Sequence, residues 1–218
     1  MRQRRSRRGA LGERRRASIL DATEALICDQ GVQGVSLGGV TATARVSRRG
    51  FHEDFTDLDD CLLAVFDAIS ARLTSAAAVA CGEHARWVDG VRAALLIILD
   101  FLQASPPRAR FLFEASVAGD PAMLARRNNL LSELARAFEA RRPPAPSDVL
   151  PPPFGAEAVI AAAASIIHAR LLEDPLPPLR ELIGPLMGVL VMPSLGDEDA
   201  REELARPLRA PRSSQRRR

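Results

Sequence analysis

The chain has 218 residues, a formal net charge of +3 and 47% hydrophobic residues, enough apolar material for one or two compact cores. Its unbroken apolar runs are far shorter than the roughly 20 residues of a membrane helix, and it opens on arginines rather than on a signal peptide. Its three cysteines include no CxxC pair, which argues against a disulfide framework and a zinc site. We therefore expect a cytoplasmic protein with no membrane partner.

Positive charge is concentrated at the two ends of the chain. Residues 1–16 have a net charge of +7 and residues 201–218 of +5, whereas residues 17–200 have a net charge of −9. Basic ends on an acidic body favour a polyanionic partner, above all nucleic acid, although basic termini are also common as plain solubilising segments. We expect a disordered basic arm at 1–13 and a disordered basic tail at 204–218.

Apolar spacing predicts helices from the start of the chain. Recurrence at three and four residues predicts a first helix from about Arg14 to Gln30, which Gly31 ends. Two short helices follow, with Ser36 and Ser47 as their N-caps. Only two residues separate them, a layout typical of a helix-turn-helix.

The second of these short helices is the expected DNA-reading element. It buries Phe51 and leads to Phe55, which leaves Arg48, Arg49 and His52 pointing outward. In a helix-turn-helix such N-terminal residues face base edges in the major groove. The following Thr56-Asp57-Leu58-Asp59 is typical of a capping box and opens a long fourth helix. We expect a DNA-binding domain at 14–60 and a helical regulatory domain at 61–203.

The stretch from Ile19 to Phe66 resembles the DNA-binding domain of TetR/AcrR-type transcription regulators. The resemblance rests on Gly31, Val46-Ser47-Arg48-Arg49, Phe51, Phe55 and Asp60-Cys61-Leu62, in one register over about fifty residues. It implies an all-α fold, with an N-terminal three-helix DNA-binding domain followed by a helical ligand-binding and dimerisation domain. It also implies that the partner is a double-stranded, palindromic DNA operator bound by a homodimer.

Three residues depart from the usual text of that family. Arg45 stands where the turn has glycine, His52 where tyrosine is usual and Leu58 where lysine is usual. The tyrosine and lysine commonly touch DNA phosphates in the family, so these departures weaken or remove two positioning contacts. The predicted DNA-binding set is Ser36, Leu37, Arg45, Ser47, Arg48, Arg49, Gly50 and His52.

Further helices are predicted in the region from about Ala80 to Glu203. Prolines at 106 and 107 end one helix, Asp120 caps another, and a proline-rich loop covers 143–153. A helix over 156–173 is rich in small residues, and one from Pro178 to about Val191 has an apolar stripe that Pro185 should kink.

The resemblance implies that these last two helices pack against a second copy of the chain. The predicted dimer contacts are Val159, Ala163, Ile166, Leu182, Leu186 and Leu190; burial within one subunit is the other interpretation. The resemblance also implies a cavity for a small effector, and the absence of tyrosine and the few polar residues on these helices favour an apolar one. Its predicted walls are Trp87, Phe101, Phe111, Phe113, Met123, Phe138 and His168, most of which would serve equally well as core.

An enzyme is not indicated. There are three histidines, no glycine-rich phosphate loop and no nucleophile elbow. No cofactor or metal site is expected, because Cys81 and His84 lack further ligands at a familiar spacing. Two alternatives stay open. One is a TetR-like coregulator that binds protein and has lost specific DNA binding, in keeping with Arg45, His52 and Leu58. The other is a metabolic enzyme that uses the helical cavity, against which the absence of a coupled acid, base or nucleophile argues.

Overall fold

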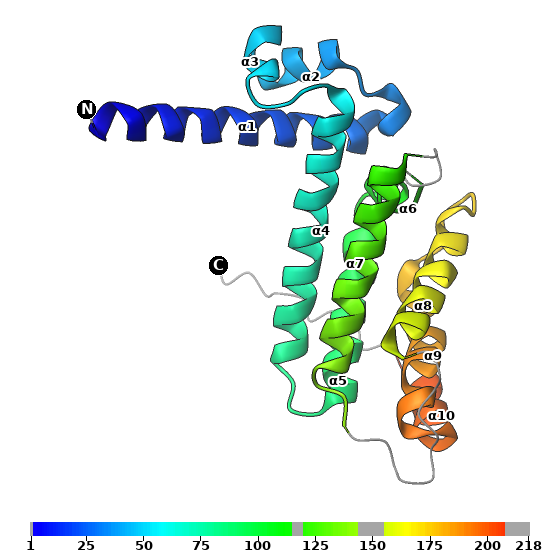
Figure 1. The fold of residues 1–218 in the computed structure, drawn as a ribbon. Coiled ribbons are helices and arrows are strands. Elements are labelled where there is room, and N and C mark those ends of the chain that lie inside the picture. The colour runs from blue at the N-terminus through cyan, green and yellow to red at the C-terminus, as the bar shows by residue number, and fades with distance from the viewer. Residues whose placement is uncertain (1, 115–119, 144–154, 208–218) are drawn as a thin grey trace, which may run out of the picture.

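The computed structural model describes residues 2–114, 120–143 and 155–207, and no strand occurs in these ranges. The first four helices are α1 (Arg2–Gln30), α2 (Leu37–Ala44), α3 (Arg48–His52) and α4 (Leu58–Gly82), with a short 3-10 turn, η1 (Val32–Gly34), after α1. Figure 1 shows α1 lying across one end of a helical bundle, with α2 and α3 on its far side. The all-α prediction is confirmed.

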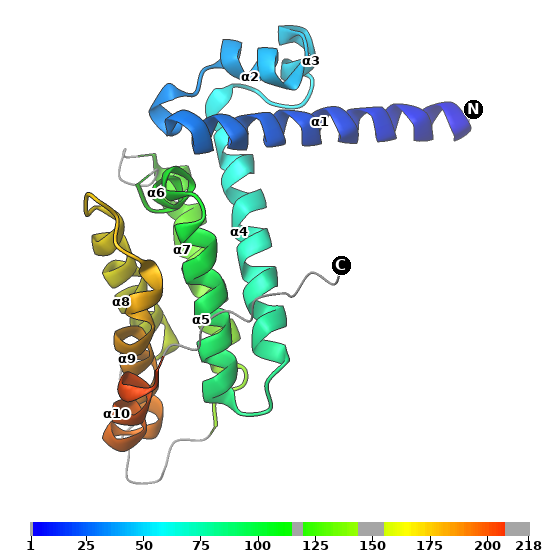
Figure 2. The same cartoon turned by 180° about the vertical axis from the view of Figure 1, so that it is seen from behind.

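The bundle contains the remaining helices. These are α5 (Trp87–Gln103), α6 (Pro106–Glu114), α7 (Pro121–Glu139), α8 (Ala156–Leu171), η2 (Leu179–Leu182), α9 (Ile183–Leu195) and α10 (Asp197–Ala205). Seen from behind in Figure 2, α8, α9 and α10 form the side of the bundle away from α4. The core runs through both parts without a break, from Ile19 and Phe51 to Leu186 and Val191.

Helix α1 is longer than its apolar spacing predicts. It begins at Arg2 rather than near Arg14, so the expectation of a disordered arm at 1–13 differs from the structure. This segment lacks an apolar stripe, which is why spacing did not indicate it. Arginine, glutamine and alanine nevertheless have high helix propensity, and the segment contains no proline to stop the helix. The N-terminal part of α1 projects beyond α2 and α3 (Figure 1).

Helix α4 joins the two parts of the molecule. The carboxylate of Asp57 accepts a hydrogen bond from the Asp60 N–H at 2.8 Å, and the Asp60 carboxylate accepts one from the Thr56 N–H at 2.9 Å. This reciprocal cap is one residue removed from the predicted box. By length and composition alone α4 is the one helix within the described ranges that could cross a membrane. In the structure its buried face, which includes Phe66 and Ile69, packs in the core.

Two prolines act differently from expectation. Pro106 lies at the start of α6, where a residue without an N–H is tolerated, so it opens that helix as well as following α5. Pro185 does not kink a longer helix, because α9 begins only at Ile183 and Pro185 falls in its first turn. The chain before it forms the separate turn η2.

Helix α10 was not predicted, and it closes the C-terminal side of the bundle. Its Leu204 lies so close to α9 that a Cβ on Gly184 or Gly188 would be 3.1 Å from Leu204 atoms. Glu203 forms a buried ion pair with Arg92 of α5 at 2.8 Å, and Arg206 pairs with Asp89 at the same distance. The hydrogen bond from Arg206 lowers the pKa of Asp89. Residues 204 and 205 of the predicted tail therefore belong to α10; residues 208–218 lie outside the described residues, as do 144–153 of the predicted loop.

Candidate functional site

Helices α2 and α3 each begin at a serine N-cap, as predicted, and a short turn joins them. The Ser36 side chain accepts a hydrogen bond from the Gly39 N–H at 3.2 Å, and the Ser47 side chain accepts one from the Gly50 N–H at 3.0 Å. Each cap satisfies one N–H that the first turn of a helix leaves without a partner. Both hydroxyl groups are exposed and keep their own O–H for a further acceptor.

Arg45 makes the turn between α2 and α3. Its backbone is left-handed, with φ 55° and ψ 41°, and it is the only non-glycine residue with positive φ in the described ranges. This conformation costs an ordinary residue roughly 1–2 kcal/mol. Its N–H bonds back to α2, at 3.2 Å from the Ala42 oxygen, and its side chain is exposed. Glycine would adopt this left-handed conformation without strain. The contribution specific to arginine at this position is therefore its exposed guanidinium group.

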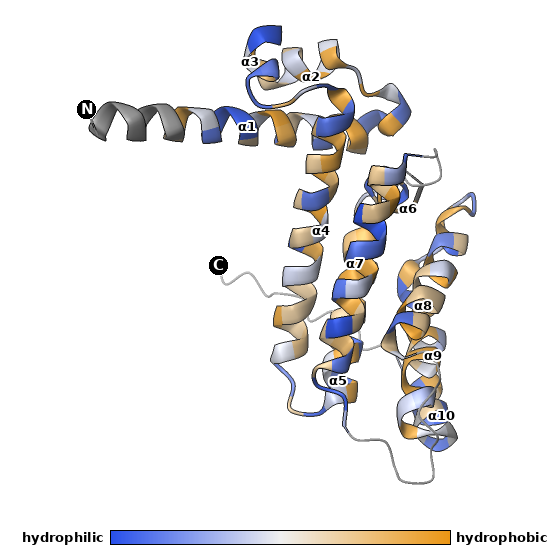
Figure 3. Ribbon diagram, viewed as in Figure 1, coloured by the Kyte–Doolittle hydropathy of each residue, from blue (hydrophilic) through white to orange (hydrophobic). Residues whose placement is uncertain are grey.

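The outer surface of α3 is basic, and most of α3 is hydrophilic in Figure 3. Arg48 and Arg49 are both exposed in its first turn. Arg49 lies 3.7 Å from Glu53, whereas Arg48 has no ion pair or hydrogen bond to any described residue. The opposite side of α3 is fixed by Phe51, which is fully buried and packs against Phe55. A short helix anchored by Phe51 thus presents in its first turn the charge of Arg48, which no described residue pairs.

Arg15 of α1 holds the far end of α3 in place. Its Nε lies 2.6 Å from Oδ2 of Asp54 and its Nη1 lies 2.5 Å from Oε2 of Glu53. The hydrogen bond to Asp54 raises the pKa of the Arg15 guanidinium. Glu53 and Asp54 are therefore already neutralised by the protein, which reduces their repulsion of an anion beside α3.

The structure brings together most of the predicted DNA-binding residues. Ser36, Arg45, Ser47, Arg48, Arg49 and His52 are all exposed on α2, α3 and the turn between them, whereas Leu37 and Gly50 are half-buried. One ring nitrogen of His52, Nδ1, lies 3.1 Å from the Thr56 carbonyl oxygen, so only Nε2 is left for an outside partner. Arg15 was missed, because nothing in its local sequence indicates a contact with residues 53 and 54.

An apolar cavity of about 170 Å³ lies inside the second part of the molecule. Of the predicted walls, Phe113 and Phe138 border it. The other five predicted residues do not border it. Trp87 donates a hydrogen bond to the Phe138 carbonyl, and His168 stacks on Phe113. Phe111 packs on Phe66, Phe101 lies beneath Arg108, and Met123 is buried elsewhere. Most of the wall consists of residues that were not singled out, among them Leu95, Ile98, Leu130, Leu134, Ile160 and Ile167.

The predicted dimer contacts are largely buried inside the single chain. Val159, Ala163, Leu182, Leu186 and Leu190 are all buried, and only Ile166 keeps partial exposure. Each of these five residues keeps less than a tenth of its surface exposed, which leaves little area for contact with a second copy. The stripe on α9 is covered by neighbouring helices of its own chain, including α8 and α10. The exposed positions of α8 are instead the small residues Ala158, Ala161, Ala162, Ser165 and Ala169, with Glu157 in its first turn and Leu172 just beyond its end.

A shared carboxylate connects the two parts of the molecule. Glu24 of α1 pairs with Arg72 of α4 and, at 3.4 Å, with Arg108 of α6. Helix α6 also carries Leu112 and Phe113, which border the cavity. One short helix therefore contacts both the cavity and the base of the helix-turn-helix.

The described ranges contain few groups suited to metal binding or to catalysis by a thiol. No group of three or more His, Cys, Asp or Glu side chains there is placed to hold a metal ion. Cys28, Cys61 and Cys81 are free thiols. Burial raises the pKa of Cys61, which keeps this thiol protonated beside Thr23.

Comparison with known proteins gives a structural likeness and no likeness by sequence. No family model matches the chain, and no curated protein matches it. A crystal structure of a TetR family transcription regulator from Marinobacter aquaeolei VT8 at 1.90 Å resolution does, with a TM-score of 0.55 and 20% identity over 90% of this chain and 100% of that chain. The chain therefore has the all-α fold of a TetR family transcription regulator.

Proposed function

We propose that this protein is a DNA-binding transcriptional repressor, that a homodimer binds a palindromic operator, and that a small molecule in the cavity releases it. The observation that carries the proposal is Arg48, which is exposed, makes no ion pair with a described residue and lies in the first turn of a helix anchored by Phe51. An arginine in this position of a helix-turn-helix donates two hydrogen bonds to the O6 and N7 of guanine.

The exposed face of α8 is the surface proposed for the second copy. Ala158, Ala162, Ser165 and Ala169 follow one another at four, three and four residues, and Ala161 is next to Ala162, so they share one side of the helix. Small side chains let two helices approach closely. Leu172 and Met192 nearby are large hydrophobic residues with 59% and 50% of their surface exposed. A stable interface buries at least about 1,200 Å² of surface in total. The exposed apolar surface of α8, Leu172 and Met192 supports the proposal that such an interface forms here.

Binding to the DNA upstream of the gene tests the proposal. We expect a near-palindromic site with half-site centres about one helical turn, or a small multiple of it, apart. Arg48→Ala should lose roughly 1–3 kcal/mol of discrimination at one guanine, whereas Arg136→Ala, an exposed arginine on α7, should bind like the wild type.

The same titrations address a second candidate function, a coregulator that binds protein. It is favoured because Arg49 already pairs with Glu53 and His52 Nδ1 already contacts the Thr56 carbonyl oxygen, so both have less capacity to bind DNA. Weak binding that salt abolishes and that shows no sequence preference would support the coregulator and overturn the repressor.

A further inference from the structure

The wall of the cavity contains four side chains that are not purely hydrocarbon: Thr74, Cys81, Arg127 and Glu133. The Thr74 hydroxyl donates to the carbonyl of Ser70 at 3.0 Å, and Arg141 lies 3.7 Å from the Cys81 sulfur. Glu133 is exposed. Arg127 is half-buried and makes no hydrogen bond or ion pair to any described residue. The cavity therefore has one cation whose charge nothing in the described chain balances.

Two other arginines of α7, by contrast, do have partners in the chain. Arg126, the preceding residue, pairs with Asp67 of α4, and Arg136 on the same helix donates to the Ser132 carbonyl. Removing a charge from water beside apolar walls is unfavourable unless a partner compensates it. A guanidinium also has five N–H donors and no acceptor, so the partner must accept hydrogen bonds.

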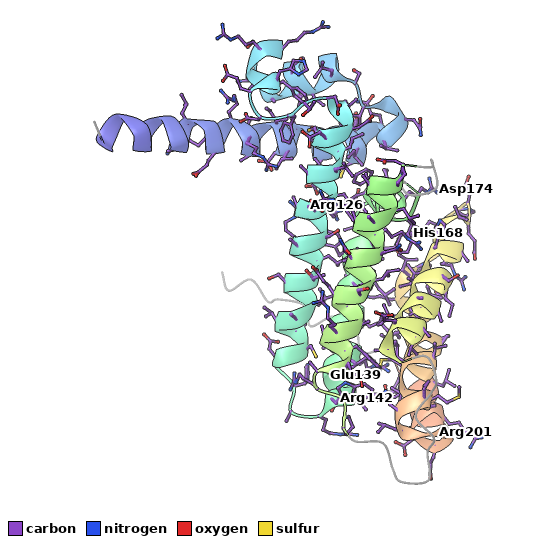
Figure 4. All side chains as sticks on the ribbon, viewed as in Figure 1. Arg126, Glu139, Arg142, His168, Asp174 and Arg201 are labelled. Atoms are coloured by element: carbon purple, nitrogen blue, oxygen red, sulfur yellow. The ribbon has the colours of Figure 1, made fainter. Side chains whose placement is uncertain are left out.

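His168 adds a second unsatisfied polar group beside the same cavity. Its ring stacks on Phe113, which borders the cavity, with centroids 5.3 Å apart and an interplanar angle of 13°. Its Nε2 is buried and has no hydrogen-bond partner. Figure 4 shows His168 in the half of the bundle that is nearer to α1. Arg127 and Phe113 both border the cavity, so one unsatisfied group lies on its wall and the other directly beside it.

We propose that the ligand of this cavity is an amphipathic carboxylate rather than a neutral apolar molecule. Its hydrocarbon chain lies among the aliphatic side chains, including Leu95, Leu130 and Ile160. Its carboxylate accepts hydrogen bonds from Arg127, and His168 Nε2–H is the second donor. Glu133 repels this head group, which fixes its orientation. The cavity, at about 170 Å³, is similar in size to an apolar cavity of about 150 Å³ that binds benzene.

This inference rests on the proposed function only in taking the cavity as the effector site, and ligand binding is measured without DNA. The probes are the straight-chain carboxylates from hexanoate to dodecanoate, with the 1-alkanol and 1-alkylamine of each length. Calorimetry on the full chain gives the affinities. Fluorescence of Trp87, the single tryptophan, gives an independent readout because its ring packs on Phe138 at the cavity wall.

We expect at least one carboxylate to bind about tenfold or more tightly than its alkanol and amine counterparts, because hydrogen bonds to charged groups are the stronger ones. Arg127→Gln should reduce carboxylate affinity by a similar factor and leave alkanol affinity unchanged. Arg136→Gln, which removes the same charge from an exposed position on α7, should change neither. His168→Phe, which keeps the stacking, should give a smaller loss for the carboxylate alone.

Three results would overturn the inference: no carboxylate in the series binds, the matched alkanol binds as tightly, or folded Arg127→Gln binds carboxylate like the wild type. Circular dichroism establishes that the variants are folded. Selective carboxylate binding by a protein that recognises no operator would support the ligand class and overturn the proposed function. The two conclusions can therefore fail separately.

Discussion

Arg15 and Asp54, which are far apart in sequence, form a two-pronged ion pair that fixes α3 against α1, with Nε and Nη2 of the arginine 2.6 and 3.1 Å from the two carboxylate oxygens. Helix α3 extends only from Arg48 to His52, too short to be stable by itself. The angle at which it presents Arg48 therefore depends on what holds its ends. At the far end, that contact is Arg15.

We predict that Arg15→Gln lowers affinity for every DNA sequence and also reduces the preference for the operator, because α3 loses its anchor. Arg14→Gln is the matched control, since Arg14 is exposed and is the next residue of α1. It removes the same charge and should lower affinity without changing the preference. Fluorescence anisotropy with operator and scrambled DNA measures both quantities. Equal loss of preference in the two variants would mean that Arg15 acts only by its charge.

Arg45→Gly should stabilise the protein. Glycine adopts the left-handed conformation of this turn without strain. Its greater conformational entropy in the unfolded chain offsets part of this stabilisation. We expect the free energy of unfolding to rise by about 0.5–1 kcal/mol. Ala42→Gly, in the last turn of α2, should instead lower it by about 1 kcal/mol. Denaturant unfolding compares the two, and a destabilised Arg45→Gly would show that the side chain itself supports the fold.

The N-terminal end of α1 should contribute to DNA binding through charge. Residues 2–8 contain five arginines, and each DNA phosphate that they neutralise steepens the logarithmic salt dependence by about 0.9. Deleting residues 2–9 should flatten this dependence and leave operator preference intact. Affinity measured over a range of salt concentrations gives the slope. An unchanged slope would assign this segment to solubility.

Ala162→Arg should convert the proposed dimer into monomers. The change places a long charged side chain on the exposed small-residue face of α8, where it would prevent close approach of a second helix. Ala125→Arg, at an exposed position of α7, is the matched control and should leave the assembly unchanged. Sedimentation velocity measures the outcome. An intact dimer of Ala162→Arg would place the interface on another face.

Arg92→Met should destabilise the C-terminal side of the bundle. Arg92 and Glu203 are each only 9% exposed at the side chain, so loss of the arginine leaves a buried carboxylate with Arg206 as its remaining partner. We expect a loss of about 3 kcal/mol in the free energy of unfolding, near the lower end for a broken buried pair. Arg86→Met breaks an exposed pair with Asp89 and should cost less than about 1 kcal/mol. Similar losses in both would mean that burial of the Arg92 pair contributes little.

The local parts of the fold were predictable because their signals are local. Ser36 and Ser47 cap the helices they were expected to cap, and the apolar spacing of α4 and α5 matches their buried faces. Helix α10 escaped prediction because its sequence is mostly charged and has no apolar stripe, while the contacts that hold it, such as Leu204 on α9 and Glu203 with Arg92, join residues far apart in sequence.

The candidate site was predictable only in part, for a geometric reason. Helical spacing tells which side of a helix is apolar, but not what covers that side. The stripe with Leu186 suited a partner copy equally well, and it is covered by the same chain. In the same way, Phe111 and Phe113 differ by two positions on one helix, yet Phe113 borders the cavity while Phe111 packs on Phe66.

The shared carboxylate of Glu24 has a practical consequence for any assay of this protein. Because Arg108 ties α6 to the base of the helix-turn-helix, a ligand that shifts α6 and a DNA that fixes α1 act on the same contact. Coupling between two sites is reciprocal in free energy. Under the proposed function, a ligand screen on the free protein would report tighter binding than the operator-bound protein allows. The concentration needed to release DNA would then exceed the measured dissociation constant by the coupling factor.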